Sequence, residues 1–204
     1  EGAFNQAFIP IYSDYQKNKN INDAKAFLNA IAGTLLTVLF VFTVIVLIFT
    51  PIFVLIFAPG FYIDPLKKDL SIQVLRIMFP YLALMSLVAF AGGIQNTHQK
   101  FTVPAFTPVL FNLSLIIAAV FVAPYYDMPI YVLAWGVLLA GFLQLLIQIS
   151  PLMSIDRLPI PKLDFKNKGV KRFITLILPA ILAGGIFQIN LLIDTIFASI
   201  LETG

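Results

Sequence analysis

Long stretches without a charged side chain recur along the chain and dominate its pattern. No charged residue occurs between Ala26 and Tyr62, and four further stretches have the same character. An α-helix rises about 1.5 Å per residue, so about 20 apolar residues cross a hydrocarbon layer about 30 Å thick. The pattern therefore predicts an all-α fold, a polytopic transmembrane helical bundle.

The apolar stretches predict six helical segments in a single transmembrane domain over residues 1–204. Their expected ranges are 2–15 (a partial span), 24–50, 70–95, 104–122, 130–149 and 171–201. We expect Pro51 to end or kink the first full span, because proline lacks an amide hydrogen and clashes with the preceding turn. The chain starts at Glu1 and enters a helical pattern at once, so we expect a fragment of a longer protein.

The composition is that of a protein surrounded by lipid, and it excludes several kinds of functional site. Hydrophobic residues make up 60% of the chain and charged residues 11%, whereas soluble domains are about half apolar and a quarter charged. Disulfides, thiolate metal sites and cysteine nucleophiles are excluded because the chain has no cysteine. No serine–histidine–acid set and no glycine-rich phosphate loop occurs, which favours a transporter over an enzyme. We expect no metal and no cofactor, and no pattern identifies a coupling ion.

Basic residues are distributed unevenly between the loops on the two sides of the membrane, and this bias predicts which side faces the cytoplasm. One side collects Lys17, Lys19, Lys25, Lys100, Arg157, Lys162, Lys166, Lys168, Lys171 and Arg172. The other side has only Lys67 and Lys68, which Asp64 and Asp69 offset. By the positive-inside rule, loops 16–23, 96–102 and 150–170 are cytoplasmic. The basic residues lie between spans, so nucleic-acid binding is not expected, and we expect the lone loop histidine, His98, to be solvated.

Polar side chains inside the predicted spans are candidate cavity residues, because a charge at the bilayer centre costs roughly 2.5–3.5 kcal/mol on insertion scales. Asn190 and Asp194 share one helical face in the last span, with Gln188 close by. They could line a cavity, or Asp194 could make an interhelical hydrogen bond. Arg76 could bind an anionic headgroup, or it could extend to the interface.

Further candidates occur nearer the start of the chain. Glu1 and Asn5 share a face of the first helix, with Gln6 adjacent, and Glu1 is either a buried functional carboxylate or a helix-end residue. Asn112 lies mid-span, and its alternatives are substrate contact and an interhelical hydrogen bond. Gln144 and Gln148 are four residues apart, and we expect interhelical hydrogen bonds from both, with substrate contact as the alternative.

Several segments resemble the MurJ (MviN) family of lipid II flippases. The first ten residues, EGAFNQAFIP, resemble that family's EGAFxQAFxP signature. Further similar segments follow in the family's order and cover essentially the whole chain: Ala58–Phe61, Arg76–Tyr81, Pro104–Pro108 with Asn112, Gln188–Thr195 and Ala198–Ser199.

The resemblance implies the multidrug/oligosaccharidyl-lipid/polysaccharide (MOP) exporter fold, in which two helical lobes surround a cavity that opens alternately to each side. Residues 1–204 would form the amino-terminal lobe from the end of its second helix through its seventh. The implied function is to move lipid II, the undecaprenyl-pyrophosphate-linked peptidoglycan precursor, from the inner to the outer leaflet of the bacterial inner membrane. The implied partners are lipid II and membrane lipids, and the implied carrier is a monomer.

The resemblance bears differently on two of the acidic candidates. Glu1 matches the acidic residue of the family signature, whereas Asp194 falls where some relatives carry Asn. The arginines on which the family's cationic cavity depends lie outside residues 1–204.

Three alternatives remain at this stage. A flippase for another polyprenyl-linked glycan would differ in the arginines upstream of Glu1. A cation-coupled drug exporter of the same superfamily would rely on Glu1 and Asp194, and ion-dependent efflux would reveal it. A non-transporting membrane scaffold would have no polar cavity between its helices.

Overall fold

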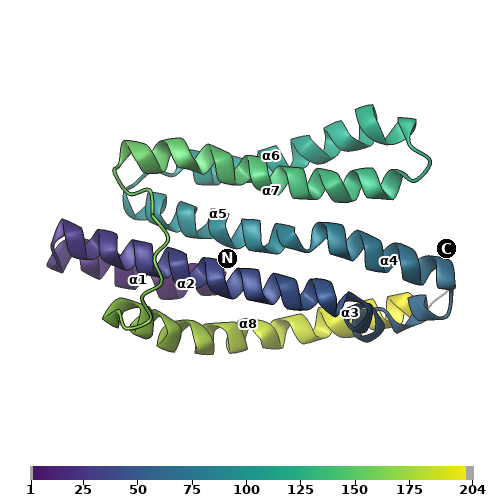
Figure 1. Ribbon diagram of the computed structural model, residues 1–204, viewed down its shortest axis with the longest axis horizontal. Coiled ribbons are helices and arrows are strands. Elements are labelled where there is room, and N and C mark those ends of the chain that lie inside the picture. The colour runs from purple at the N-terminus through teal and green to yellow at the C-terminus, as the bar shows by residue number, and fades with distance from the viewer. Residues whose placement is uncertain (1, 201–204) are drawn as a thin grey trace.

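The fold is a bundle of α-helices that lie roughly along one long axis (Figure 1). The computed structural model describes residues 2–200, apart from the side chains of Ala3, Ala183, Ile186, Phe187, Ile189, Asn190, Ala198, Ser199 and Ile200. Residues 2–200 contain no β-strand, which confirms the all-α prediction. The α-helices are α1 (Gly2–Asn18), α2 (Ile21–Ile48), α3 (Thr50–Phe57), α4 (Pro65–Met78), α5 (Pro80–Thr97), α6 (Thr102–Ile117), α7 (Pro129–Ser154) and α8 (Lys168–Ile200).

The helices stack in layers. In Figure 1, α6 and α7 lie together at the top, α4 and α5 follow, then α1 and α2, and α8 lies beneath them. The contacts agree, because α7 packs against both α5 and α6, and α1 packs against both α5 and α8. Helix α1 is therefore covered on several sides, whereas α6 lies at the edge of the bundle.

Proline positions explain most of the breaks between helices. Helix α2 ends at Ile48, and α3 begins at Thr50 with Pro51 in its first turn, as predicted for this proline. The segment Pro65–Thr97 is divided at Phe79, because Pro80 cannot donate the next amide hydrogen bond. Helix α6 does not stop at Ile117 but widens into a π-helical turn, η2 (Ala118–Val122), and then a 3₁₀ turn, η3 (Ala123–Tyr125).

The core lies between α1, α2, α5 and the first turns of α8. Phe8 and Tyr12 of α1 are fully buried, and their rings stack 5.4 Å apart between centroids. Phe27 from α2 stacks on Phe8, and Phe90 from α5 meets Phe8 edge-on. Aromatic pairs in these geometries contribute about 0.5–1.5 kcal/mol each beyond the area that they bury. This aromatic stack fixes α1 at the centre of the bundle.

Two helices end on residues in the left-handed conformation that are not glycine. Gln99 follows α5 with φ 59°, and Asp156 follows α7 with φ 55°. At the first end the Lys100 amide donates to the Gln95 carbonyl at 2.9 Å, and at the second the Arg157 amide donates to the Leu152 carbonyl at 2.9 Å. Both are Schellman ends, which reverse the chain sharply and satisfy carbonyls of the last turn.

The connection from α7 to α8, residues 155–167, runs as an extended strap along α2. The Ile160 amide donates to the Asn29 side-chain oxygen at 2.8 Å, and the Lys162 amide donates to the Asn29 carbonyl at 3.0 Å. One turn further along α2, a Cβ on Gly33 would lie 2.4 Å from the Lys162 carbonyl oxygen. The strap therefore rests directly on the backbone of α2 and joins α7 and α8 to it.

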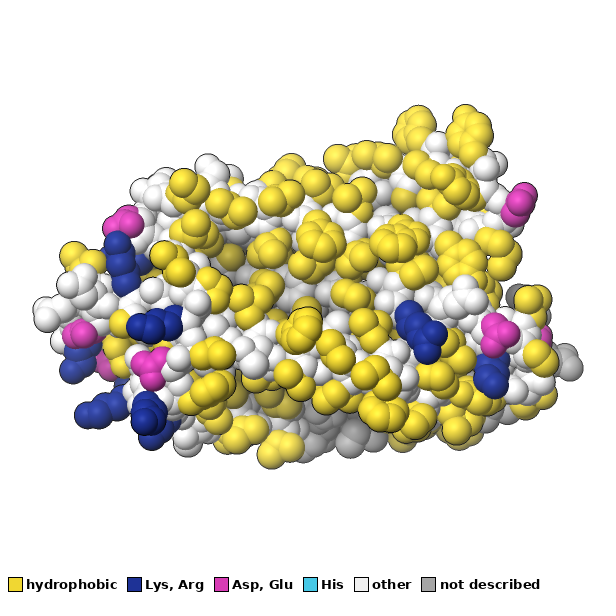
Figure 2. Space-filling model, in the orientation of Figure 1, with side chains coloured by type: hydrophobic (Ala, Val, Ile, Leu, Met, Phe, Trp, Pro, Cys, Tyr) yellow, Lys and Arg dark blue, Asp and Glu magenta, His cyan; other side chains and the backbone are white. Residues whose placement is uncertain are grey.

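The outside of the bundle is apolar along its middle and charged at its ends. Figure 2 shows hydrophobic side chains across the middle of the visible face and most Lys and Arg side chains at one end. Among the described residues, four segments are long and apolar enough to cross a membrane: Ile21–Ile48, Pro65–Thr97, Thr102–Tyr125 and Pro129–Ser154. Exposed apolar side chains such as Phe40, Phe121 and Trp135 would be costly in water, so lipid is the solvent that this surface fits.

Candidate functional site

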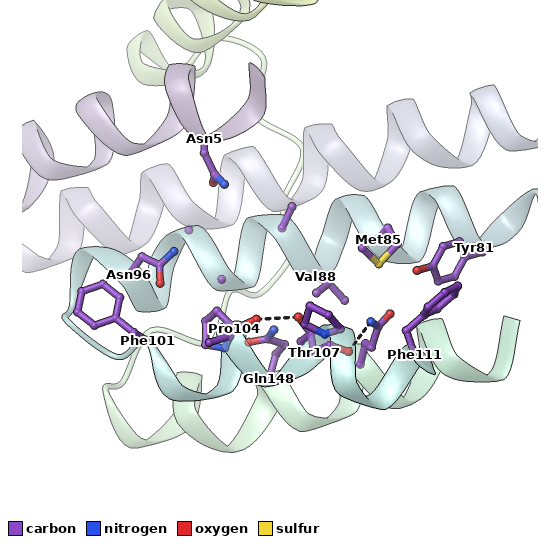
Figure 3. A pocket seen from close by; sticks show the side chains of 16 residues that line it. Asn5, Tyr81, Met85, Val88, Asn96, Phe101, Pro104, Thr107, Phe111 and Gln148 are labelled. Atoms are coloured by element: carbon purple, nitrogen blue, oxygen red, sulfur yellow. Dashed lines mark hydrogen bonds between the residues drawn. The ribbon is translucent and has the colours of Figure 1, made fainter. Parts of the chain in front are cut away.

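A polar pocket of about 520 Å³ lies between α1, α5, α6 and α7 (Figure 3). Its volume falls in the range typical of small-molecule sites, about 300–1,000 Å³. The residues that line it come from all four helices and, with Phe101, from the turn before α6: Asn5, Tyr81, Met85, Val88, Ala89, Gly92, Gly93, Asn96, Phe101, Pro104, Ala105, Thr107, Pro108, Phe111, Gln144 and Gln148.

Helical spacing on α5 builds one long wall of the pocket. Tyr81, Met85, Val88, Gly92 and Asn96 recur at three- or four-residue steps, so they occupy one face of the helix. The small residues towards the end of this stripe, where α1 packs across α5, leave room between the helices. A Cβ on Gly93 would lie 3.1 Å from the Asn5 side-chain oxygen, so the glycine allows this close approach.

Prolines on α6 shape the facing wall. Pro108 cannot donate to the Pro104 carbonyl, and the Thr107 hydroxyl donates to that carbonyl instead, at 2.7 Å. The Gln144 side chain reaches across from α7 and donates to the Thr107 carbonyl at 2.7 Å (Figure 3). In lipid every backbone polar group needs a protein partner, so the Thr107 hydroxyl makes the proline-interrupted helix tolerable. The Gln144 hydrogen bond joins α7 to this part of α6.

A second glutamine pair lies next to this contact. Gln95 on α5 donates through Nε2 to Oε1 of Gln148 on α7, and both side chains are buried. The prediction of interhelical hydrogen bonds from Gln144 and Gln148 is confirmed. Because interhelical amide bonds help to hold helices together in a bilayer, α5, α6 and α7 form one hydrogen-bonded unit around the pocket.

The amides around the pocket retain unused hydrogen-bonding atoms. Asn5 Oδ1, Gln95 Oε1, Gln144 Oε1 and Gln148 Nε2 are buried without a hydrogen-bond partner in the described structure. Gln144 and Gln148 are each only 1% exposed. An unpaired buried polar atom costs about 1–3 kcal/mol, so this concentration of unpaired atoms marks a place where a polar partner is expected.

The predicted cavity residues fall in different places. Asn5 lines the polar pocket, whereas Gln6 is exposed on α1. Asn112 is exposed on α6 and Arg76 on the last turn of α4, and neither lines the polar pocket.

The remaining predicted residues lie on α8 or outside the description. Gln188 and Asp194 are exposed on α8, away from the polar pocket. Asn190 belongs to α8, but its side chain lies outside the described part, as does the whole of Glu1. The structure therefore brings Asn5 together with Asn96, Gln144 and Gln148, and not with the polar residues of α8.

The expectation that His98 is solvated is wrong. Its ring is part-buried and lies 2.8 Å from the Gln16 side-chain nitrogen through Nε2. The ring also packs near Tyr12, at 5.9 Å between centroids. The Schellman end at Gln99 places His98 directly after the last residue of α5, as its C-cap, where its side chain turns back towards α1 rather than outward.

The fold and the pocket define a polytopic α-helical membrane protein with a polar site inside the bundle. Comparison with known proteins identifies its family. The family model described as "Lipid II flippase MurJ" matches residues 1–204, and the chain belongs to that family. This confirms the family prediction made from the sequence motifs.

Individual relatives are similar over the same range. The chain is 40% identical over 204 residues to a protein named "Probable lipid II flippase MurJ" from Buchnera aphidicola subsp. Acyrthosiphon pisum, covering 100% of this chain and 40% of the relative. It is 38% identical over 208 residues to "Lipid II flippase MurJ" from Burkholderia cenocepacia, again covering 100% and 40%. The chain thus spans about two fifths of the length of these relatives.

A solved structure shows the same fold. It is titled "Lipid II flippase MurJ, inward closed conformation" and has a TM-score of 0.79 and 23% sequence identity. The match covers 99% of this chain and 41% of the solved one.

Proposed function

We propose that the full-length protein is a monomeric carrier that moves lipid II from the inner to the outer leaflet of the bacterial cytoplasmic membrane. Membership of the flippase family along the whole chain carries this proposal. The polar pocket supports it, because unpaired amides inside an apolar bundle are suited to a substrate whose headgroup must leave water.

The physical problem explains why a polar pocket is needed. A pyrophosphate and sugar headgroup cannot cross hydrocarbon unaided, since moving polar and charged groups out of water without partners is costly. A site between helices would shield the headgroup while the polyprenyl tail stays in lipid. Alternating access would then expose this site to each side in turn.

The arrangement of the loops supports the proposed direction. The Gln16 side chain contacts His98. Arg172, just after the loop 150–170, pairs at 3.0 Å with Asp14, just before the loop 16–23. The loops 16–23, 96–102 and 150–170 therefore meet at one end of the bundle. This is the end at which Lys and Arg gather in Figure 2. We therefore place this end in the cytoplasm, where the positive-inside rule puts it.

The test uses cells that depend on the full-length protein. Depletion is expected to lower the fraction of lipid II that a membrane-impermeant reagent reaches in the outer leaflet of spheroplasts, and re-expression is expected to restore it. An unchanged outer-leaflet fraction after depletion would refute the proposal.

Single variants then test the candidate contacts. Asn5→Ala and Glu1→Gln, expressed at wild-type levels, are expected to reduce this fraction. Undiminished flipping by either variant would remove that residue from the site. The same assay applies to the other candidates Gln6, Arg76, Asn112, Gln188, Asn190 and Asp194.

A further inference from the structure

The polar side chains that line the polar pocket are all uncharged. Its lining residues include four amides, Asn5, Asn96, Gln144 and Gln148, and no Lys, Arg, His, Asp or Glu among the described residues. A pyrophosphate buried here would lack the cations or charge-assisted donors that a desolvated anion needs. The pocket therefore fits a neutral polar group and not the charged part of a lipid headgroup.

The unpaired atoms around the polar pocket include both hydrogen-bond donors and hydrogen-bond acceptors. Asn5 Oδ1 and Gln144 Oε1 are buried acceptors without a partner in the described structure, and Gln148 Nε2 is a buried donor without one. The oxygen and nitrogen positions of the side-chain amides can be exchanged in both Gln95 and Gln148 without losing the hydrogen bond between the two residues. After this exchange, one carbonyl oxygen and one amino group of the pair are still unpaired. Hydroxyl and acetamido groups each donate and accept, so they complement this set.

The rest of the lining suits a ring-shaped ligand. Tyr81, Phe101 and Phe111 contribute flat aromatic side chains at the two ends of the pocket, and Figure 3 shows the labelled amides between them. Apolar walls with a few placed polar groups are the usual composition of a ligand site. A sugar, which presents C–H faces as well as hydroxyl groups, matches both surfaces.

We propose that this pocket binds the uncharged glycan portion of the lipid-linked substrate, while the pyrophosphate lies outside it. The inference rests on the proposed flippase function and adds that different parts of the protein bind the sugar and the pyrophosphate. Asn5, Gln144 and Gln148 recognise sugar hydroxyl or acetamido groups, and cationic groups elsewhere in the full-length protein neutralise the pyrophosphate.

Equilibrium binding to the full-length protein in lipid nanodiscs tests the assignment with two ligands. One is lipid II, and the other is undecaprenyl pyrophosphate, which has no sugar and no peptide. Asn5→Ala is expected to weaken lipid II binding about 5-fold, the equivalent of one lost hydrogen bond of about 1 kcal/mol. The same variant is expected to bind undecaprenyl pyrophosphate as the wild type does.

A steric variant tests the pocket independently of hydrogen bonding. In Gly92→Ala the added Cβ would meet Pro104 Cβ at 3.5 Å, an ordinary contact, so the methyl group narrows the pocket without displacing the backbone. It is expected to show the same selective loss of lipid II binding. Asn22→Ala, which removes an exposed amide at the start of α2, is the matched control and is expected to change neither affinity.

The outcomes separate the assignment from the proposed function. Selective loss of lipid II binding in both pocket variants supports the assignment. Equal loss for both ligands, or no loss for either, overturns it and leaves the flippase proposal standing. A wild-type protein that binds neither lipid overturns both.

Discussion

At the scale of single residues, backbone conformation decides where two helices end. Gln99 has φ 59°, a conformation that costs a non-glycine residue roughly 1–2 kcal/mol. Its side chain is exposed, so nothing in the described structure requires glutamine there. Gln99→Gly is expected to raise the free energy of unfolding by about 0.5–1 kcal/mol, because glycine removes the strain but loses more backbone entropy on folding. The measurement is the unfolding midpoint of the purified full-length protein in mild detergent.

The matching control lies in the middle of a helix. Apart from its chain neighbours and the nearby backbone of α8 itself, no described atom lies within 4 Å of the position that a methyl group on Gly184 would occupy, so Gly184→Ala adds helix propensity without a clash. A rise in midpoint for Gln99→Gly that does not exceed the scatter among replicate wild-type samples would contradict the strain argument.

The second non-glycine end, Asp156, gives a prediction about pH. A hydrogen bond from Lys25 Nζ and the charge of that ammonium hold the pKa of the Asp156 carboxyl below its ordinary value. A depressed pKa in the folded state means that the ionised form stabilises the fold above the unfolded-state pKa. The contribution is lost as pH falls through the lower, folded-state pKa.

Asp156→Asn should therefore be slightly less stable than wild type at pH 7. The difference should shrink as the pH falls below the ordinary carboxyl pKa and vanish below the lowered, folded-state pKa of Asp156. The effect is small because the side chain is exposed to solvent. Unfolding midpoints of the two proteins across this pH range provide the measurement. A difference that persists unchanged at pH 3 would show that the ion pair is not its source.

At the scale of elements, the α7–α8 strap is the feature with the clearest mechanical consequence. Gly33→Ala would place a Cβ 2.4 Å from the Lys162 carbonyl oxygen, a backbone atom that a side-chain rotation cannot move. The strap must then lift from α2, and we expect a loss of about 1–3 kcal/mol in stability. Limited proteolysis should also cleave residues 155–167 faster than in wild type, with Gly184→Ala as the glycine-to-alanine control.

The helices could be predicted from the sequence, whereas the contacts that assemble the site could not. Charge-free runs and prolines determine where helices form and break, and the break at Pro51 follows from local chemistry alone. The ends at Gln99 and Asp156 carry no glycine signal, so the chain reversals there and the position of His98 were not predictable. The polar pocket depends on four helices that meet in space. Of its lining residues, the sequence indicated only Asn5, as a candidate cavity residue, and the i,i+4 pair Gln144 and Gln148.

At the scale of the whole molecule, the bundle has two chemically different ends, and this asymmetry should fix its orientation in the membrane. The strap, the first turns of α2 and α8 and the turn after α5 gather the basic residues at one end. The opposite end includes Asp127, in the turn between η3 and α7. The positive-inside rule depends on such local Lys and Arg bias close to the spans, and here the bias involves several loops at once.

The absence of cysteine from these 204 residues makes the orientation directly measurable. Asp127→Cys and Lys166→Cys each introduce one thiol at an exposed position, one at either end of the bundle. In intact cells that express the full-length protein, with any cysteines elsewhere in it replaced, a membrane-impermeant maleimide should label position 127 and not position 166. Permeabilised cells should show labelling at both, which controls for the reactivity of each thiol. Labelling at 166 alone in intact cells would invert the orientation, and the polar pocket would then have to load its substrate from the opposite leaflet.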